Sequence, residues 1–594
     1  MRIQLNTKRL QRLRNSLLFL SFFLLCQAAF AQNNNDPDMP DFAKYKLNKE
    51  EFMKRRAEAI AMRRGIEKDK LLDPKLRLDA IRMMEEQKAR LQASRDPAQV
   101  NLVSTAWTPI GPNPIPNGQV ATGPSTPVSG RVSAIAVHPT NANIAYVGTA
   151  QGGVYRTTDG GTTWTPILDG AASLAIGAIA ISPSSPEIVY IGTGEATFSG
   201  SSFFGVGVYR INNASTTANV SGPFRLNAAS ADIFSGRAIG EIIVHPTNAD
   251  IIFVASASGV GGILGNTTGL TLPSRGIYRC NNATSANPVF AKLTGLLADL
   301  NVSVRDIAID PSNPNILIAN PIAGGANQGG IYRTVNALAA DPTTVTFTQT
   351  HIVNNTSTSE LVIEFAGVHP AGDPDATFYA ASGQGGGRVL KSINGGVTWT
   401  QTIANNFCNP QCFYDVAIAV DPTNPNTVYL GGSPTLVSAK STNGAVSFTD
   451  NRTSVHVDTH VMTVSESNTS QVWLGTDGGI YKSLDAGLTW TNLNNSTFSA
   501  TQFMSLALHP TDPVFTIGGT QDNGTNFINP SSVWSRVDGG DGGYTQIDQN
   551  AVNTTNVRQY HTYFNASNLQ GYGTIATVGS GWAFRGCQTT GATV

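Results

Sequence analysis

Charged side chains are scarce in this chain. Lys, Arg, Asp and Glu make up 13% of the 594 residues, about half of the ~25% that is usual for soluble domains. The formal net charge is −1, which excludes the strongly basic surface that nucleic-acid-binding proteins use to neutralise phosphates. Few charges together with 59 glycines favour short strands joined by tight turns.

Long apolar runs are also lacking beyond the N-terminal region. There, basic residues from Lys8 to Arg14 precede an apolar stretch from Ser16 to Cys26, and Ala29-Phe30-Ala31 follows as a small-residue cleavage site. The stretch is short for a membrane span, so the sequence predicts a signal peptide over residues 1–31, with an uncleaved anchor as the alternative. We expect a secreted or cell-surface protein without a transmembrane segment once the signal is removed.

Cysteine is rare, with five residues in all. Removal of Cys26 with the signal leaves Cys280, Cys408, Cys412 and Cys587. Disulfides are allowed in an exported chain, and the Asn-Pro turn between Cys408 and Cys412 suits a small closed loop. The CxxxC spacing leaves three outcomes open: a local disulfide, free thiols or a metal site.

Residues 32–100 differ from everything that follows, because they are rich in charge and poor in glycine. Lys49–Arg64 and Asp73–Ala93 have helical composition with apolar residues at helix-like spacing. Asp73-Pro74 is typical of an N-cap followed by proline at the first helical position. We expect a charged helical arm or linker that is a spacer, is docked on the main domain, or binds a partner.

From residue 101 onward the chain repeats one short pattern. The first repeat predicts a strand over 130–137, a turn, a strand over 144–148, a third strand from residue 152, and a hairpin leading into a fourth. The turn with its second strand recurs eight times, starting at His138, Ser182, His245, Asp310, His369, Asp421, Ser465 and His509. Four short strands per repeat predict an all-β fold, a seven- or eight-bladed β-propeller of four-stranded blades over residues 101–594, preceded by the short helical arm.

The strand pattern fades after Phe564, before a last repeat is complete. Rings of blades usually close by pairing the first strands with the last. We therefore expect either a C-terminal truncation or a last blade that is completed by residues 105–120.

A second motif, Ser/Thr-x-Asp-x-Gly-x-Thr-Trp, marks the hairpins. Its Asp accepts backbone N–H groups across a tight turn, its Gly takes a positive φ, and its Trp packs between sheets. We therefore interpret the Asp as structural rather than catalytic. The Asp or Asn and the Trp of the three best copies are Asp159 and Trp164, Asn394 and Trp399, and Asp485 and Trp490; a weaker copy has Asn443 and Phe448.

These hairpins resemble the Asp-box, or BNR, repeat. The resemblance covers about residues 105–560 and is closest to sortilin-type propellers and to bacterial glycosyl hydrolase-like exported proteins. It implies that the boxes lie at the blade periphery, away from the functional face. A sortilin-type resemblance implies extracellular protein or peptide ligands, and the hydrolase-like proteins imply glycans.

Sialidases, which share the repeat, would imply three arginines around a substrate carboxylate. Arg131, Arg237 and Arg305 stand in first strands, which line a propeller's central channel. They either point into one ligand-binding cup or make rim hydrogen bonds to neighbouring blades. The Phe/Tyr-Arg-Ile-Pro motif of sialidases is absent from the sequence.

Double-propeller xyloglucan-cleaving enzymes would imply a catalytic Asp in a Thr-Asp-x-Gly-Gly-x-Tyr segment. Ala150 takes that place in the first repeat, whereas a similar late segment, Thr476-Asp477-Gly478-Gly479, has an Asp. Glycoside hydrolysis needs two carboxyl groups across the bond, and Glu195 and Asp415, as well as Asp522 and Asp541, are candidate companions. The catalytic candidates are therefore Asp477, Glu195 and Asp415.

The segment His456-Val457-Asp458-Thr459-His460 is the sharpest polar constellation. On a strand, residues at i, i+2 and i+4 share one face, so His456, Asp458 and His460 would project together into the channel. They would either hold a divalent metal ion or form a hydrogen-bonded network. No other cofactor is indicated.

These patterns favour an exported propeller that binds a protein, peptide or glycan ligand. The alternative is a glycoside hydrolase-like enzyme that uses channel carboxylates.

Overall fold

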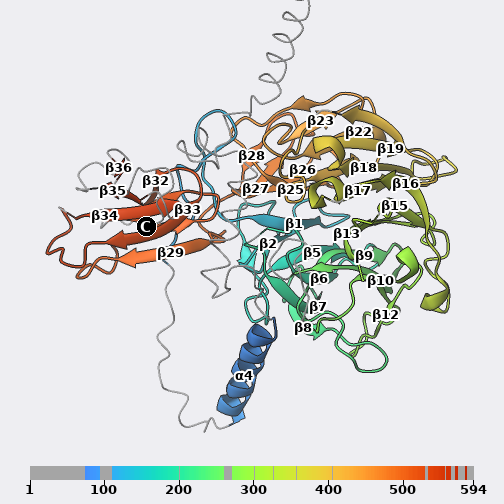
Figure 1. The fold of residues 1–594 in the computed structure, drawn as a ribbon, viewed down its shortest axis with the longest axis horizontal. Helices are drawn as coiled ribbons and strands as arrows, with labels where there is room; N and C mark the ends of the chain where they lie inside the picture. Colours follow the sequence, from blue (N-terminus) through green and yellow to red (C-terminus); the bar gives the residue numbers. More distant parts are fainter. Residues whose placement is uncertain are drawn as a thin grey trace, which may run out of the picture.

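The computed structural model describes residues 74–93, 110–199, 201–259, 271–299, 301–325, 327–355, 357–404, 406–528, 533–555, 557–563, 569–572 and 582–584. Within them the chain forms nine four-stranded antiparallel sheets, each made of strands that follow one another in sequence. Figure 1 shows most of these sheets arranged around a centre, with β29–β36 set to one side. The expected all-β propeller of four-stranded blades is thus confirmed.

The first four sheets consist of β1 (Val132–Val137), β2 (Ala145–Thr149), β3 (Val154–Thr157) and β4 (Thr165–Pro166); β5 (Ile176–Ile181), β6 (Ile188–Gly194), β7 (Phe204–Asn212) and β8 (Asn219–Phe224); β9 (Arg237–His245), β10 (Asn248–Ser258), β11 (Gly276–Cys280) and β12 (Phe290–Lys292); and β13 (Ser303–Ile309), β14 (Leu317–Ile322), β15 (Gly329–Thr334) and β16 (Thr348–Val353).

The next three sheets consist of β17 (Ile363–Val368), β18 (Thr377–Ser382), β19 (Arg388–Ser392) and β20 (Thr400–Ala404); β21 (Ala417–Asp421), β22 (Asn424–Gly431), β23 (Ala439–Ser441) and β24 (Thr449–Asp450); and β25 (Thr459–Val464), β26 (Val472–Thr476), β27 (Gly479–Ser483) and β28 (Thr491–Asn492). Short helical turns connect some of these strands: α5 (Thr358–Leu361), η2 (Leu296–Asp299), η3 (Pro342–Thr344) and η4 (Gln384–Gly386).

Seven sheets, from β1 to β28, close into a ring. A separate apolar cluster fills each space between neighbouring sheets. One of these clusters joins Val132 and Trp164 of the first sheet to Trp473 of the seventh, which closes the circle. Face-to-face packing therefore buries both faces of every sheet in the ring, as the propeller architecture requires.

Two further sheets lie outside the ring. They comprise β29 (Phe503–Leu508), β30 (Thr516–Thr520), β31 (Thr525–Ile528) and β32 (Trp534–Asp538), and β33 (Gly542–Ile547), β34 (Gln559–Tyr563), β35 (Leu569–Tyr572) and β36 (Ala583–Phe584). Their own apolar cluster, which includes Phe515 and Ile547, holds them together. The repeats predict one propeller over residues 101–594, but the eighth repeat, at His509, falls in this outer pair because the ring already closes at the seventh sheet.

Burial follows strand position within each blade. The second strand β2, which has neighbours on both sides, is buried along its whole length, whereas the outermost strand β4 is exposed. The sequence of a strand that is covered on both faces is a continuous run of apolar residues, without the alternation of polar and apolar residues. This explains the Ala-Tyr-Val-Gly type of segment that recurs after each turn.

The repeated hairpins share one hydrogen-bond pattern. Asp485 accepts the backbone N–H of Thr489 at 2.8 Å and the Thr489 hydroxyl at 2.6 Å, and Ser483 accepts the N–H of Gly487 at 2.7 Å. The hairpins at Asp159, Asn394 and Asn443 repeat these backbone contacts. The carboxylates are therefore turn formers, as their spacing predicts.

Each hairpin Trp connects its blade to the preceding one. Trp164 of the first sheet donates its indole N–H to the carbonyl of Leu493, after the seventh sheet, and its ring meets Trp473 edge-on. Trp399 donates to Thr350 of the fourth sheet. Trp490 packs against the cluster that contains Tyr429 of the sixth sheet.

The helical arm is docked on the ring. Helix α4 (Pro74–Ala93) packs Leu78 and Ile81 against the cluster between the first two sheets, and the Arg77 guanidinium lies 4.6 Å from the ring centre of Phe203. The predicted signal peptide at 1–31 and helix at 49–64 lie outside the described residues. None of the helices in the described part of the chain combines the length and apolar character that a membrane crossing needs.

Two of the cysteines pair with each other. A disulfide joins Cys408 to Cys412, which is the local pairing among the three outcomes left open by the sequence. Cys280 is buried as a free thiol, and Cys587 lies outside the described residues.

Removing a hairpin carboxylate should loosen its blade. We expect Asp485→Ala to lower the free energy of unfolding by about 1–2 kcal/mol, because several hydrogen bonds to one carboxylate are lost. Chemical denaturation measures the change. Asp169→Ala is the matched control, since Asp169 is an exposed turn residue; equal effects of the two substitutions would contradict the structural role of Asp485.

Candidate functional site

Three carboxylates from distant parts of the chain converge on one guanidinium. Arg131, directly before β1, contacts Glu195 at 2.7 Å through Nη1, Asp477 at 2.8 Å through Nε, and Asp522 at 3.4 Å through Nη2. The side chains of all four residues are at most 1% exposed. Burial lowers the pKa of Arg131, but Glu195, Asp477 and Asp522 raise it well above its usual value. We call these four residues the Arg131 cluster.

The members of the cluster come from turns at the ends of strands. Glu195 follows β6 in the second sheet, Asp477 stands between β26 and β27 in the seventh, and Asp522 stands between β30 and β31 outside the ring. The Gly478-Gly479 sequence makes the turn after Asp477 tight: a Cβ at Gly478 would stand 2.4 Å from the His456 ring. The cluster therefore forms only when the ring is closed and the outer pair of sheets is seated.

Asp477 has the richest surroundings of the three acids. Tyr414 donates its hydroxyl to Oδ2 at 2.5 Å, and His460 Nε2 lies 2.6 Å from Oδ1. Burial raises the pKa of Asp477, and the Asp522 carboxylate raises it further, while Arg131 and His460 act in the opposite direction. A carboxyl group in this position holds its proton to higher pH than a surface aspartate does.

Neighbouring polar residues pack against the cluster without joining it. Asp415, the third catalytic candidate, lies 3.4 Å from the Gln411 amide, which also reaches Asp458 at 3.3 Å. Asp541 accepts the backbone N–H of Asp522 at 3.1 Å. Asp415 and Asp541 thus belong to a buried hydrogen-bonded surround, whereas Glu195 and Asp477 touch the guanidinium.

The expected alternation of His456, Asp458 and His460 on one strand face does not occur. Asp458 has φ of 60°, and β25 begins only at Thr459, so the three residues are not on one strand. His456 faces the Val457 and Asp522 carbonyls, while His460 faces Asp477. Among the described residues, no group of three His, Cys, Asp or Glu side chains is placed to hold a metal ion.

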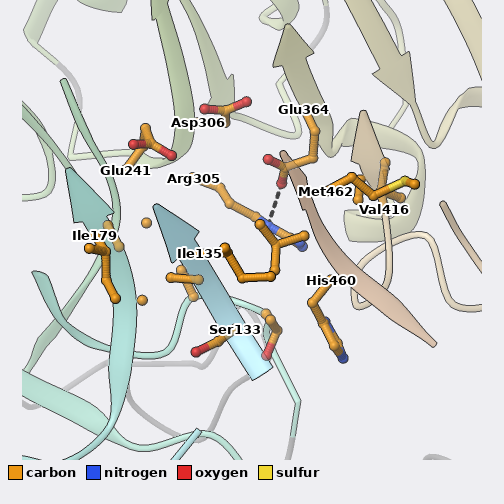
Figure 2. A pocket seen from close by; sticks show the side chains of 18 of the residues that line it. Ser133, Ile135, Ile179, Glu241, Arg305, Asp306, Glu364, Val416, His460 and Met462 are labelled. Carbon is orange, nitrogen blue, oxygen red and sulfur yellow. Dashed lines mark ion pairs between the residues drawn. The ribbon is translucent and has the colours of Figure 1, made fainter. Parts of the chain in front are cut away.

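A polar cavity occupies the centre of the ring. Its volume is about 220 Å³, and it is lined mainly by the first strands of the seven sheets. Figure 2 shows Glu241, Asp306 and Glu364 gathered along one side, with Arg305 paired to Glu364. The ionisable residues that line the cavity are Glu195, Glu241, Arg305, Asp306, Glu364 and His460.

Burial and mutual repulsion raise the pKa values of Glu241, Asp306 and Glu364. Burial raises the pKa of Glu241 to about 8, with a further contribution from Glu364. Burial, Glu364 and Glu241 together raise the pKa of Asp306 well above its usual value. The pKa of Glu364 is also raised by burial, although Arg305 counteracts this through an ion pair of 2.5 Å. The pKa values of Glu241, Asp306 and Glu364 are therefore all raised, and that of Glu241 lies above 7.

The three arginines proposed from their first-strand positions separate in space. Arg131 is the centre of its cluster, and Arg305 lines the cavity, where it also donates to the Phe413 carbonyl at 2.8 Å. Arg237 instead donates to the Pro273 carbonyl at 2.7 Å, and burial lowers its pKa to about 10. They do not form one three-arginine cup.

Several site residues have only a weak sequence signal. Glu241, Asp306 and Glu364 are acids inside largely apolar first strands of a chain with few charges. An acid at such a position is the one sequence signal that indicates a polar site there. Tyr414 lies in a loop with no motif, so only the fold brings its hydroxyl to Asp477.

No family model matches the chain, and neither does any curated protein. Among solved structures, it is similar to the GH74 xyloglucanase from Xanthomonas campestris, with TM-score 0.50 and 13% identity over 78% of this chain and 74% of that chain. It is also similar to an ancestral GH74 enzyme, with TM-score 0.50 and 15% identity over 81% of this chain and 64% of that chain. A GH74 enzyme from Niastella koreensis has TM-score 0.47 and 15% identity over 79% and 74% of the two chains. The two likenesses with TM-score 0.50 show the β-propeller fold.

Neutralising the central guanidinium should be costly. We expect Arg131→Met to lower the free energy of unfolding by about 3–5 kcal/mol, because it leaves buried carboxylates without a partner. Arg225→Met serves as the control, since the Arg225 side chain is 39% exposed. Denaturant titration of both variants tests this, and a loss below about 1 kcal/mol in Arg131→Met would contradict the buried pairing.

The raised pKa of Glu241 predicts a pH dependence of stability. Between its unfolded pKa, near 4.5, and its folded pKa, about 8, the folded state binds the extra proton, so stability falls as pH rises. We expect Glu241→Gln to flatten that fall by at most about 1.4 kcal/mol per pH unit. Unfolding measured from pH 5 to 8 tests this against Asp169→Asn; identical slopes in wild type and Glu241→Gln would contradict a buried proton on Glu241.

Proposed function

We propose that this chain is an exported glycoside hydrolase-like protein that acts on a glycan at the Arg131 cluster, with Asp477 as the proton donor. The observation that carries the proposal is the convergence of Glu195 and Asp477 on one guanidinium, at 2.7 and 2.8 Å. Because both bind the same planar group, their contacting oxygens are within about 8 Å of each other, inside the range of up to ~9.5 Å that glycosidase carboxyl pairs span.

The two acids stand in different electrostatic environments. Asp477 has a raised pKa, as a general acid needs. Glu195 is bound by Arg131 through Oε1, while its Oε2 has no hydrogen-bond partner. Glycoside hydrolysis requires two carboxyl groups in such different roles, one that donates a proton and one that acts as a base or nucleophile.

Tyr414 and His460 would act as positioning residues for Asp477. The Tyr414 hydroxyl contacts Oδ2 and the His460 imidazole contacts Oδ1, so both carboxyl oxygens are oriented. The xyloglucanase among the structural neighbours makes a β-glucan the first substrate class to test.

Access to Asp477 requires a movement. The Arg131 cluster is buried, and the turn that carries Asp522 covers it from the outer pair of sheets. A glycan would reach Asp477 when this turn moves away from the ring, which would also free Arg131 from its longest contact, 3.4 Å to Asp522.

Replacing the Asp477 carboxyl group by an amide should strongly slow hydrolysis. On a panel of xyloglucan, other β-glucans and mannans, we expect reducing ends to appear with the wild type, and Asp477→Asn to slow the reaction at least about 100-fold, as loss of a general acid does. Asp169→Asn should keep the wild-type rate. Undiminished hydrolysis by Asp477→Asn would refute the assignment.

The complete burial of the cluster favours a second candidate function, a glycan-binding module without hydrolysis. Affinity electrophoresis on the same polysaccharides distinguishes the two. Retardation without release of reducing ends supports the binding module, whereas retardation with hydrolysis supports the enzyme.

A further inference from the structure

The central cavity holds more acidic than basic groups. Four carboxyl groups line it, those of Glu195, Glu241, Asp306 and Glu364, and Arg305 is the one arginine or lysine among the described lining residues. Arg305 is already engaged by Glu364 at 2.5 Å and by two backbone carbonyls. Buried carboxylates need either a proton or a cationic partner. Glu195 is paired with Arg131 and Glu364 with Arg305, so Glu241 and Asp306 are the acids among the described lining residues that form no ion pair.

Two deeply buried polar atoms on the cavity lining lack a protein partner. Glu195 is 0% exposed and its Oε2 has no hydrogen bond, and His460 is 8% exposed and its Nδ1 has none. Buried polar atoms are almost always satisfied by protein, water or ligand. Both residues line the same cavity, so an occupant of the cavity is one way to satisfy them.

The cavity is large enough for an organic molecule. Its volume of about 220 Å³ is far above the ~10–15 Å³ that one ordered water needs on this kind of measure. Its walls are of two kinds: Ile135, Ile179 and Met462 supply apolar surface, while the carboxyl groups of Glu241, Asp306 and Glu364 gather along one side (Figure 2). An occupant with a short carbon body and a positively charged end matches both.

A bare metal ion does not match this arrangement. Metal ions need several oxygen ligands at 2.0–2.6 Å, and no three acidic or histidine side chains among the described residues are close enough to provide them. A primary ammonium group has three N–H donors and binds carboxylates at hydrogen-bond distance, which suits acids spread around a wider space.

We propose that the central cavity binds a small primary ammonium compound, with its charged end toward Glu241, Asp306 and Glu364. Glu241 is largely protonated at neutral pH. On binding it would release its proton to solvent and, as a carboxylate, accept hydrogen bonds from the ammonium N–H groups. No covalent bond is made or broken. This inference goes beyond the proposed hydrolase, because its ligand binds Glu241, Asp306 and Glu364 and not Asp477, although Glu195 and His460 border both places.

Isothermal titration calorimetry of the full chain at pH 7 tests the proposal. The probes are n-butylamine, glucosamine and Nα-acetyl-lysine amide, which share the ammonium but represent a free amine, an amino sugar and a peptide side chain. Butanol, glucose and Nα,Nε-diacetyl-lysine amide are uncharged controls. Each titration is repeated in phosphate and in HEPES, whose different ionisation enthalpies reveal proton release.

We expect at least one ammonium probe to bind with release of protons and its uncharged control not to bind; the probe that binds identifies the source. Glu241→Gln imitates the protonated acid, so it should preserve the fold and weaken binding at least tenfold. Asp169→Asn, with the same change of charge on an exposed turn, should bind as the wild type does.

Three results would overturn the proposal: no binding by any ammonium probe, equal binding of the charged and uncharged members of a pair, or undiminished affinity in both Glu241→Gln and Glu364→Gln. Calcium titration is the competing arm, and saturable calcium binding that blocks the ammonium probes and releases the same protons would replace the ammonium with a metal ion. Circular dichroism of each variant confirms that its fold is intact, so that lost binding reports on the cavity.

Discussion

The guanidinium of Arg131 holds together parts of the molecule that the chain alone leaves far apart. It binds acids from the second and seventh sheets of the ring and from the first sheet outside it. Apolar contacts between blades do not by themselves specify which side chains must meet. A buried charge does, because it is stable only where its charged partners are in place. The Arg131–Asp477 pair thus reinforces ring closure at the place where Trp164 and Trp473 pack.

The same constraint gives the site its chemistry. Several acids lie at the centre of the ring and at the junction with the outer sheets, where burial raises their pKa values. Asp477 and Glu241 both have a raised pKa for this reason. His460 connects the two regions, since its Nε2 contacts Asp477 while the residue lines the cavity. Polar groups in such surroundings are either fully satisfied or await a ligand.

Local patterns predict the blades well because each blade is built from short-range turns. The segment from His138 to Gly148 contains its own turn and strand, and Thr157–Trp164 contains its own hydrogen bonds, so both can be identified without a fold. The number of blades in the ring cannot be predicted in this way, because it depends on the long-range contact between the seventh sheet and the first. The eighth repeat, at His509, has the same local pattern as the others although it lies outside the ring.

The site could be predicted only where a motif marks it. Asp477 is identifiable from its Thr476-Asp477-Gly478-Gly479 segment, and Arg131 and Glu195 from their places beside apolar strands. Glu241, Asp306 and Glu364 come together only when three blades pack, and no local spacing relates them. The alternation from His456 to His460 misleads because the left-handed backbone at Asp458 interrupts the strand on which the shared face depends.

The most direct test of this account is a double-mutant cycle between Arg131 and Asp477. Unfolding free energies of wild type, Arg131→Met, Asp477→Asn and the double variant give the coupling between the two side chains. We predict a coupling of about 1.5–3 kcal/mol, because residues in one buried network are not independent. Additivity within about 0.3 kcal/mol would contradict it, since the two groups would then contribute separately and the ring would not depend on their contact.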